Sequence, residues 1–228
     1  MDSIGKNSIK EVFGVTGNIA SGKSYALDTF KQIAKKENIK ISLVQVDEIR
    51  REILTSSKDL TFIKLRQTLV EKLNLSLIQN SPYYAISGLE LGETIFSSEK
   101  KMETYKDIVN PFIRDILTSK INNSKGIIVV EWAMLAEDGW LDLVNGNVVL
   151  LKCSESTQSN RLMDTDLPLS QLHKRIKFQL NTKRKTNLIK KWQKKYNRGR
   201  LFVFDTSCSP EIDSYKSLFH EIINSLPR

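Results

Sequence analysis

The sequence predicts an α/β fold in which a five-stranded parallel sheet is wrapped by helices. Five short segments rich in Val, Ile, Leu and Phe alternate with segments whose apolar residues recur at helical spacing. Parallel strands are buried on both faces and therefore give continuous apolar runs of this kind. A glycine-rich loop separates the first apolar run from the first helical pattern. The predicted strands are Glu11–Thr16, Ile39–Val46, Gly126–Glu131, Asn147–Lys152 and Leu201–Asp205.

The glycine-rich loop reads Gly-Asn-Ile-Ala-Ser-Gly-Lys-Ser over residues 17–24, the complete G-x-x-x-x-G-K-[ST] pattern. Its glycines let backbone N–H groups point at a polyphosphate, and the N-terminus of the next helix adds a favourable field. In this pattern Lys23 reaches the β- and γ-phosphates and the Ser24 hydroxyl binds Mg²⁺. The sequence thus predicts an ATP site made by Gly17, Asn18, Ile19, Ala20, Ser21, Gly22, Lys23, Ser24 and Tyr25.

Helical patterns fill the intervals between the predicted strands. They cover residues 23–36, 48–73, 88–121, 155–163, 169–196 and 210–223. The interval Glu48–Lys125 holds no convincing strand pattern, and Asn74–Ser87 has the composition of a loop. We therefore expect one domain, residues 1–228, with no independent second domain. Its core would be about 9–47, 126–153 and 200–228, its helical substrate lobe about 48–125, and its basic lid region about 154–199.

Composition limits the class of protein. The chain has 228 residues and 40% hydrophobic content, enough for a sizeable core. No apolar run approaches the roughly 20 residues that span a bilayer, and the first residues lack an apolar signal-peptide region. Cys153 and Cys208 lie far apart and form no metal-spaced cluster. We expect a cytoplasmic enzyme with reduced thiols and no membrane partner.

The excess positive charge comes from one segment. Lys174–Arg200 carries twelve Lys and Arg residues and no acid, so the total of 35 − 26 = +9 becomes 23 − 26 = −3 without it. Three interpretations remain open: a solvated helical face, a lid that supplies cations to transferring phosphates, or a surface for nucleic acid. The aromatic residues Trp192 and Tyr196 within the segment are compatible with the third.

Acidic residues follow two of the predicted strands, where ligands of parallel α/β folds bind. Asp47 follows the second strand and could orient an attacking hydroxyl, or it could cap the next helix. Glu131 follows four apolar residues and could complete a magnesium site with Ser24, or it could be a capping or surface residue. Both readings stay open for each residue.

Seven short segments, in the family's order, resemble the dephospho-coenzyme A kinases, a family of P-loop nucleotide kinases. Residues 14–24 resemble the family's Gly-Leu-Thr-Gly-Gly-Ile-Gly-Ser-Gly-Lys-Ser, and residues 46–49 its Asp-Ala-Asp-x-Ile segment. Residues 91–96 and 108–111 are similar to its Leu-x-x-x-Val-Phe and Ile-x-His-Pro, and residues 131–137 to its Asp-x-Pro-Leu-Leu-Phe-Glu. Residues 158–163 and 175–179 resemble its lid. The match covers most of the chain and is far more selective than the phosphate loop alone.

The resemblance implies a three-layer P-loop kinase fold with a helical substrate lobe and a helical lid. It also implies phosphorylation of the ribose 3′-hydroxyl of dephospho-coenzyme A by Mg²⁺·ATP, a step of coenzyme A biosynthesis. Asp47 matches the carboxylate that the family assigns to the substrate hydroxyl. Arg161 and Arg175 match lid positions that close over the phosphates, and with Lys23 they complete the implied catalytic set.

The chain departs from the family pattern at several positions. Asn110 replaces the histidine of the His-Pro pair, Glu131 replaces an aspartate, and Asp205–Ser207 differs from the usual Asp-Asn-x-Gly near adenine. Gly88 and Thr165 stand where arginines are expected. Two alternatives therefore remain: a kinase for another nucleoside or nucleotide, or a non-catalytic ATP-binding or nucleic-acid-binding protein. The sequence does not specify an oligomeric state.

Overall fold

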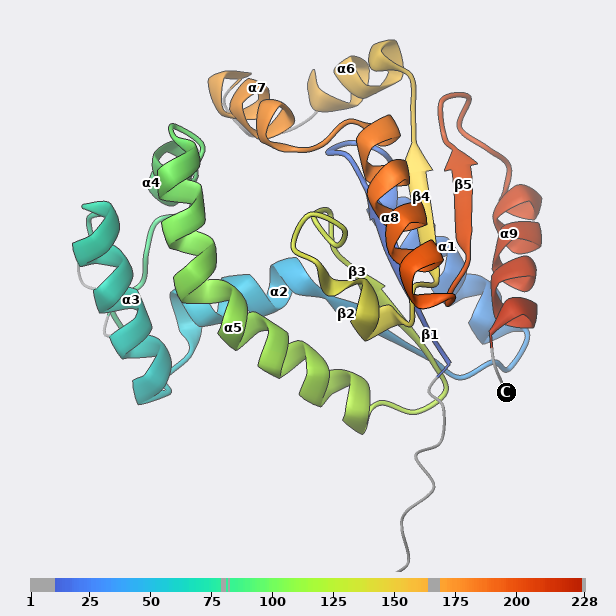
Figure 1. Cartoon of the computed structure of the whole chain (residues 1–228), viewed down its shortest axis with the longest axis horizontal. Helices are drawn as coiled ribbons and strands as arrows, with labels where there is room; N and C mark the ends of the chain where they lie inside the picture. The colour runs from blue at the N-terminus through green and yellow to red at the C-terminus, as the bar shows by residue number, and fades with distance from the viewer. Residues whose placement is uncertain (1–10, 79–80, 82, 164–168, 227–228) are drawn as a thin grey trace, which may run out of the picture. The chain divides into compact units, whose positions relative to one another are not determined.

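The computed structural model describes residues 11–78, 81, 83–163 and 169–226. The chain folds as two compact units, each assembled from separate stretches of sequence. The first holds the chain up to Val44, Ser124–Gln158 and the chain from Asn181 onward, and the second holds Gln45–Asn123 and Ser159–Leu180. The region predicted as a lid is therefore divided, because its second half groups with the sheet. Figure 1 labels the elements of both units.

The first unit is built on a five-stranded sheet with the strand order β2-β3-β1-β4-β5. Strand β1 pairs in parallel with β3 and β4, and β4 pairs in parallel with β5 (Figure 1). All five predicted strands are confirmed to within two residues at each end. They are β1 (Val12–Gly17), β2 (Ile41–Gln45), β3 (Ile127–Glu131), β4 (Val148–Lys152) and β5 (Leu201–Asp205).

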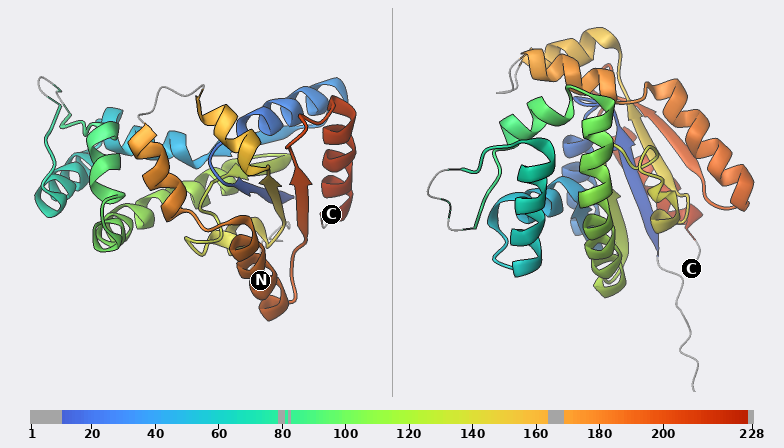
Figure 2. Two further views of the ribbon diagram at one scale, coloured as in Figure 1. Left: turned by 90° about the horizontal axis from the view of Figure 1, so that it is seen from above. Right: turned by 60° about the vertical axis from the view of Figure 1, so that its left-hand side comes forward.

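Helices cover both faces of this sheet, which confirms the predicted three-layer α/β class. On one face lie α1 (Lys23–Lys36) and α9 (Ile212–Ser225), and on the other lies α8 (Thr182–Tyr196), as the left view of Figure 2 shows. The 3₁₀ turn η2 (Trp140–Val144) packs beside β1. Gly14 of β1 allows this close approach, since an added Cβ would lie 2.4 Å from Leu135 Cδ2 and the side chain of Leu135 would have to shift.

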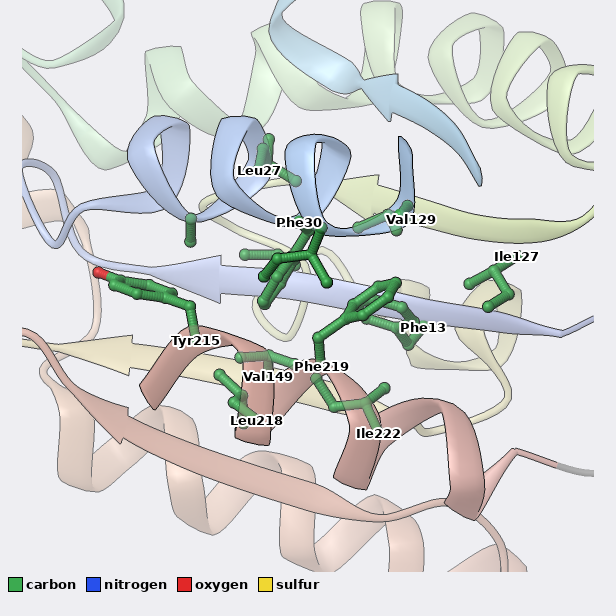
Figure 3. Close-up of a cluster of buried hydrophobic side chains, with 14 of the residues drawn as sticks. Phe13, Leu27, Phe30, Ile127, Val129, Val149, Tyr215, Leu218, Phe219 and Ile222 are labelled. Atoms are coloured by element: carbon green, nitrogen blue, oxygen red, sulfur yellow. The ribbon is translucent and has the colours of Figure 1, made fainter. Parts of the chain in front are cut away.

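The main hydrophobic core lies between the sheet and the α1/α9 pair (Figure 3). Its centre is aromatic: the ring of Phe30 stacks on Phe219 with centroids 5.3 Å apart and meets Phe13 edge-on at 6.2 Å. All three side chains are fully buried. Each such aromatic ring contributes a large apolar area, so this layer fixes α1, and with it the loop that precedes α1, against the sheet.

The regular elements described in the second unit are helices, and an isolated antiparallel bridge joins Leu77 to Ile86. The elements of this unit are α2 (Val46–Arg51), the π-helical turn η1 (Glu52–Ser56), α3 (Leu60–Leu73), α4 (Gly88–Ile95), α5 (Glu99–Asn123) and α7 (Leu169–Phe178). Helix α6 (Glu155–Met163) begins in the first unit and ends in the second. Within the second unit α5 packs against α2, α3 and α4.

Three predicted long helices are each interrupted, and the sequence prediction of continuous helices was wrong at these points. Asp59 accepts a hydrogen bond from the Thr61 amide at 2.8 Å and begins α3. The Asn181 side chain accepts a hydrogen bond from the Arg184 amide at 2.9 Å, and α8 begins there. Between α4 and α5 the helix stops at Phe96 and restarts at Glu99. Asp and Asn start new helices because their side chains satisfy otherwise unpaired amides.

A buried arginine holds together the loop that joins α3 to α4. Arg66 is fully buried and donates to the carbonyls of Tyr83 at 2.8 Å, Ile53 at 2.5 Å and Ser57 at 2.7 Å. These three acceptors belong to the loop, to η1 and to the turn before α3. Burial lowers the pKa of the Arg66 guanidinium from its ordinary value. One side chain thus connects three separate pieces of backbone.

Candidate active site

The predicted phosphate loop joins the end of β1 to the first turn of α1. Two glycines adopt backbone conformations that other residues rarely reach: Gly17 has φ 151° and Gly22 has φ 85°. A Cβ at Gly17 would lie 2.4 Å from the Leu151 carbonyl oxygen and 2.5 Å from Ser21 Oγ. The first amides of a helix have no intrahelical partner, so α1 presents free donors where the loop ends.

The carbonyl groups of the loop are all engaged by surrounding donors. Lys23 Nζ donates to the Gly17 and Asn18 oxygens at 3.1 Å each. The Ile19, Ala20 and Ser21 oxygens accept from Gln158 Nε2 at 2.8 Å, Cys153 Sγ at 3.8 Å and Thr206 Oγ1 at 3.1 Å. Because these donors hold the carbonyl side of the loop, its amide side is available for an anion. The Lys23 ammonium thus rests on two carbonyls of the loop.

The loop itself carries two unusual features. Ala20 has φ 59°, a left-handed conformation that is costly for a residue with a Cβ. Among the described residues, Asn18 Oδ1 and Ser21 Oγ are buried and have no hydrogen-bond partner. Buried polar atoms in native proteins are normally paired, so these two indicate that a ligand completes the loop.

The carboxyl end of β3 is tied to the loop strand through one carbonyl group. The Ala133 oxygen accepts from Thr16 Oγ1 at 3.1 Å and from Lys185 Nζ at 2.7 Å. Lys185 is fully buried and also pairs with the nearly buried Glu137 carboxylate. Sequence analysis did not distinguish Lys185 from the other cations of the basic segment. Glu131, at the end of β3, is itself buried with 6% exposure.

Trp132 and Trp140 are packing residues. Their rings stack with centroids 6.1 Å apart, and the Trp132 indole donates to Asp138 Oδ2 at 2.7 Å. Both are buried. These contacts hold the loop that follows β3. Packing within the protein is therefore sufficient to explain Trp132, without a nucleobase stacked on its ring.

The turn after β5 holds the triplet Asp205–Ser207, which departs from the family pattern. Asp205 accepts from the amide of Ser207 at 2.9 Å and from its hydroxyl at 2.5 Å, and it pairs with Lys152 Nζ at 3.1 Å. These Ser207 hydrogen bonds, with a smaller effect of Lys152, lower the pKa of Asp205 to about 2. Thr206 is fully buried between the Ser21 and Lys152 carbonyls. The altered triplet therefore still supports the phosphate loop.

A cavity of about 690 Å³ in the second unit brings together predicted and unpredicted charged residues. Its polar end contains Asp47, Arg50, Arg51 and Arg175, which come from α2 and α7. The remaining wall is mostly apolar and consists of Leu54, Thr55, Ile78, Ile86, Ser87, Gly88, Leu89, Leu91, Gly92, Ile95 and Phe96. A cavity of this size and polarity suits a small ligand with an anionic end and an apolar arm.

Asp47 and Arg50 form an ion pair one helical turn apart, with Asp47 Oδ1 2.8 Å from Arg50 Nη2. Burial alone would lower the pKa of Arg50, but Tyr105 and Asp47 more than offset it and the pKa is raised. Sequence reasoning selected Asp47 and missed Arg50. The signal was present, because residues three apart on a helix share a face.

Arg175 faces the same cavity from α7. Its guanidinium lies over the Phe96 ring at 5.5 Å, and its Nε is buried without a hydrogen-bond partner among the described residues. Burial and then the positive charge of Arg50 lower the pKa of Arg175, while Asp47 acts in the opposite direction. Arg50 and Arg175 line the same cavity, and two guanidinium groups there suit an anion.

The remaining residues that the family resemblance singled out have surroundings that differ from those of Arg175. Arg161 lies half-buried in the last turn of α6 and is not part of the described cavity lining. Gly88 lines the cavity, and an added Cβ there would meet nothing within 4 Å. Thr165 lies outside the described residues. Asn110 sits within α5 immediately before Pro111.

A parallel sheet of this order with a complete phosphate loop after β1 is typical of the P-loop nucleotide-binding fold. The solved structure titled TT1252 from Thermus thermophilus shares the fold, with a TM-score of 0.66 and 16% identity over 97% of this chain and 100% of that one. A family model described as dephospho-CoA kinase matches residues 11–197, and the chain belongs to the dephospho-CoA kinase family. It is therefore an enzyme of the nucleotide-dependent kinase class.

Curated relatives agree with this assignment. A dephospho-CoA kinase of Oceanobacillus iheyensis is 29% identical over 182 residues, which cover 78% of this chain and 84% of that protein. A dephospho-CoA kinase of Nostoc sp. is 29% identical over 178 residues, with coverage of 77% and 84%. In the part of the chain that the structure describes, no helix is both long and apolar enough to cross a bilayer.

Proposed function

We propose that this enzyme transfers the γ-phosphoryl group of ATP to the ribose 3′-hydroxyl of dephospho-coenzyme A. The observation that carries the proposal is the cavity of the second unit, where one carboxylate, Asp47, stands among the guanidinium groups of Arg50 and Arg175. This arrangement offers an acceptor for a hydroxyl proton beside cations for phosphates. The names of the relatives supply the particular acceptor.

On the donor side, the loop from Gly17 to Ser24 binds the triphosphate and Lys23 supplies a charge to its terminal phosphates. Ser24 is exposed at the start of α1 and Glu131 ends β3, so a hydroxyl and a carboxylate oxygen are offered. Oxygen donors of this kind, completed by water and phosphate, fit Mg²⁺. When bound, Mg²⁺ neutralises charge on the phosphate oxygens, and Ser24 and Glu131 would hold it.

On the acceptor side, Asp47 accepts a hydrogen bond from the ribose hydroxyl and orients it for attack. Its ion pair with Arg50 restricts the carboxylate to one orientation, which is the main requirement in phosphoryl transfer. Arg175 and Arg161 neutralise charge that develops on the transferring group. The apolar wall formed by residues such as Leu54, Ile86 and Ile95 suits the pantetheine arm.

The decisive experiment is an ADP-release assay with dephospho-coenzyme A, nucleosides and nucleoside monophosphates as acceptors. We expect release to depend on dephospho-coenzyme A and the product to carry a 3′-phosphate. Release with a different acceptor alone would replace the proposed substrate, and no release with any of them would leave only nucleotide binding. Cys153 and Cys208 carry reduced thiols, which suits work in the reducing cytoplasm.

Two pairs of variants test the assigned residues. Lys23→Ala should nearly abolish turnover, whereas Lys31→Ala, an exposed lysine of the same helix, should not. Asp47→Asn should lower kcat far more than ATP affinity, whereas its exposed neighbour Glu48→Gln should change neither. Normal turnover in Asp47→Asn would remove Asp47 from the mechanism.

Arg161→Ala tests the lid. If Arg161 stabilises charge in the transition state, its loss should slow the chemical step by roughly 10³-fold. A change confined to KM would instead make Arg161 a substrate-binding residue.

A further inference from the structure

The outward face of α8 is a continuous cationic surface. Its exposed cations within the helix are Lys183, Arg184, Lys190, Lys191, Lys194 and Lys195. At about 100° per residue these positions fall within one arc of about 140°. Among the described residues, none of these six side chains takes part in a salt bridge. We call this set the α8 cationic face.

The opposite side of α8 is occupied by its own fold. Ile189 and Lys185 are buried, and the Lys185 ammonium is paired with Glu137. Gln193 Nε2 donates to the Gly146 carbonyl at 2.7 Å, and a Cβ on Gly146 would lie 2.5 Å from the Trp192 ring. The basic helix is therefore a fixed part of the sheet unit, which holds its outer charges in a defined arrangement.

Such a face is electrostatically unfavourable in the isolated protein. Lysines at i and i+4, such as Lys190 with Lys194 and Lys191 with Lys195, repel each other by about 0.2–0.5 kcal/mol per pair. Nothing in the described structure offsets this repulsion with an acid. A polyanionic partner would do so, and the phosphate donor and acceptor sites proposed above use none of these six residues.

The composition of the α8 cationic face indicates which class of polyanion it suits. Helices that bind membranes present an apolar face to the lipid, but the apolar face of α8 packs on the sheet. Of its large apolar residues, Leu188 and Tyr196 are the exposed ones, at 38% and 53%. The face is thus almost purely cationic, which suits phosphate groups on the outside of a double helix and not a lipid interior.

We propose that the α8 cationic face binds the phosphate backbone of double-helical nucleic acid. From Lys183 to Lys195 the cations extend along about 18 Å of helix, at about 1.5 Å per residue. That length matches about five base pairs at about 3.4 Å each, so several phosphates can be contacted together. Because the contacts are to phosphate, binding is independent of base sequence and falls steeply with salt. It is a second activity of the chain, independent of the kinase reaction.

The test is fluorescence anisotropy of the full chain with labelled DNA and RNA duplexes of about 20 base pairs, from about 0.05 to about 0.3 M salt. The test variant is Lys190→Gln/Lys191→Gln/Lys194→Gln/Lys195→Gln. Its matched control is Lys31→Gln/Lys35→Gln/Lys36→Gln/Lys40→Gln, four exposed lysines whose loss changes net charge equally. Circular dichroism and thermal unfolding establish that both variants fold, and ADP release should be normal in the α8 variant.

We expect the wild-type chain to bind at least one of the two duplexes, and the α8 variant to bind at least tenfold more weakly. Each lost phosphate contact should reduce the slope of log K against log salt by about 0.9, hence by about 3 to 4 in total. The control should keep the wild-type slope. Absence of duplex binding, equal loss in the control, or binding only to vesicles with about 30% phosphatidylserine would overturn the proposal.

Discussion

The buried pair of Lys185 and Glu137 allows a quantitative test of how the end of β3 is held in place. Lys185 has no exposed side-chain surface and Glu137 has 8%, and the ammonium also donates to the Ala133 carbonyl. Lys185→Met keeps the length of the side chain and removes its charge. The Glu137 carboxylate then stays buried without its cation, and Ala133 keeps only the Thr16 hydrogen bond.

Breaking a buried ion pair by removing one partner costs about 3–5 kcal/mol, because an uncompensated charge remains. For a chain of this length, each kcal/mol lost from the free energy of unfolding lowers the melting temperature by about 2–4 °C. We therefore expect Lys185→Met to lower the melting temperature by roughly 6–20 °C. The assay is thermal unfolding followed by circular dichroism, with urea unfolding as a second measure of the free energy.

The double variant Lys185→Met/Glu137→Leu is the internal control. It removes both charges, and replacing a buried pair by apolar residues is often neutral. Its stability should therefore lie well above that of Lys185→Met. A single variant within 1 kcal/mol of wild type, or a double variant less stable than the single one, would refute the reasoning.

Three further predictions concern single side chains. Arg66→Leu should destabilise the chain by several kcal/mol, since it leaves three carbonyls unpaired at about 1–3 kcal/mol each; hydrogen exchange in α3 should accelerate, and unchanged protection would contradict this. Ala20→Gly should stabilise the chain by about 1 kcal/mol in urea unfolding, because glycine accepts φ 59° without strain. Asp205 has a depressed pKa, so its stabilising effect is present above 3.8 and is lost as pH falls toward about 2; carboxyl NMR should give that pKa, and Ser207→Ala should return it toward 3.8.

Local sequence signals predicted the loop that we propose binds the phosphate donor. The phosphate loop, β1 and α1 are contiguous, and the glycines at 17 and 22 have the conformations that the motif requires. The five strands were also found, because strands buried on both faces are recognisable as short apolar runs. The interruptions of the long helices were missed. Periodicity continues across a short break, whereas the caps at Asp59 and Asn181 are set by single side chains.

The residues of the proposed acceptor site come together only in the tertiary structure. Asp47 was selected from its place after a strand, but nothing local places Arg175 beside Arg50, since they are far apart in sequence. The same holds for Lys185, which is one of twelve cations in a basic segment and yet is buried against Glu137. Composition cannot separate that lysine from its solvent-exposed neighbours, because burial is a property of the folded chain.

The sequence by itself determined the α/β class, the strands, the family and the glycine-rich loop between β1 and α1, because each is encoded in consecutive residues or in their spacing. Only the tertiary structure decided which charges share a cavity, which lysine of the basic segment is buried and which face of α8 remains exposed. Those outcomes rest on contacts between residues distant in the chain, and their electrostatic consequences depend on distances that exist only after folding.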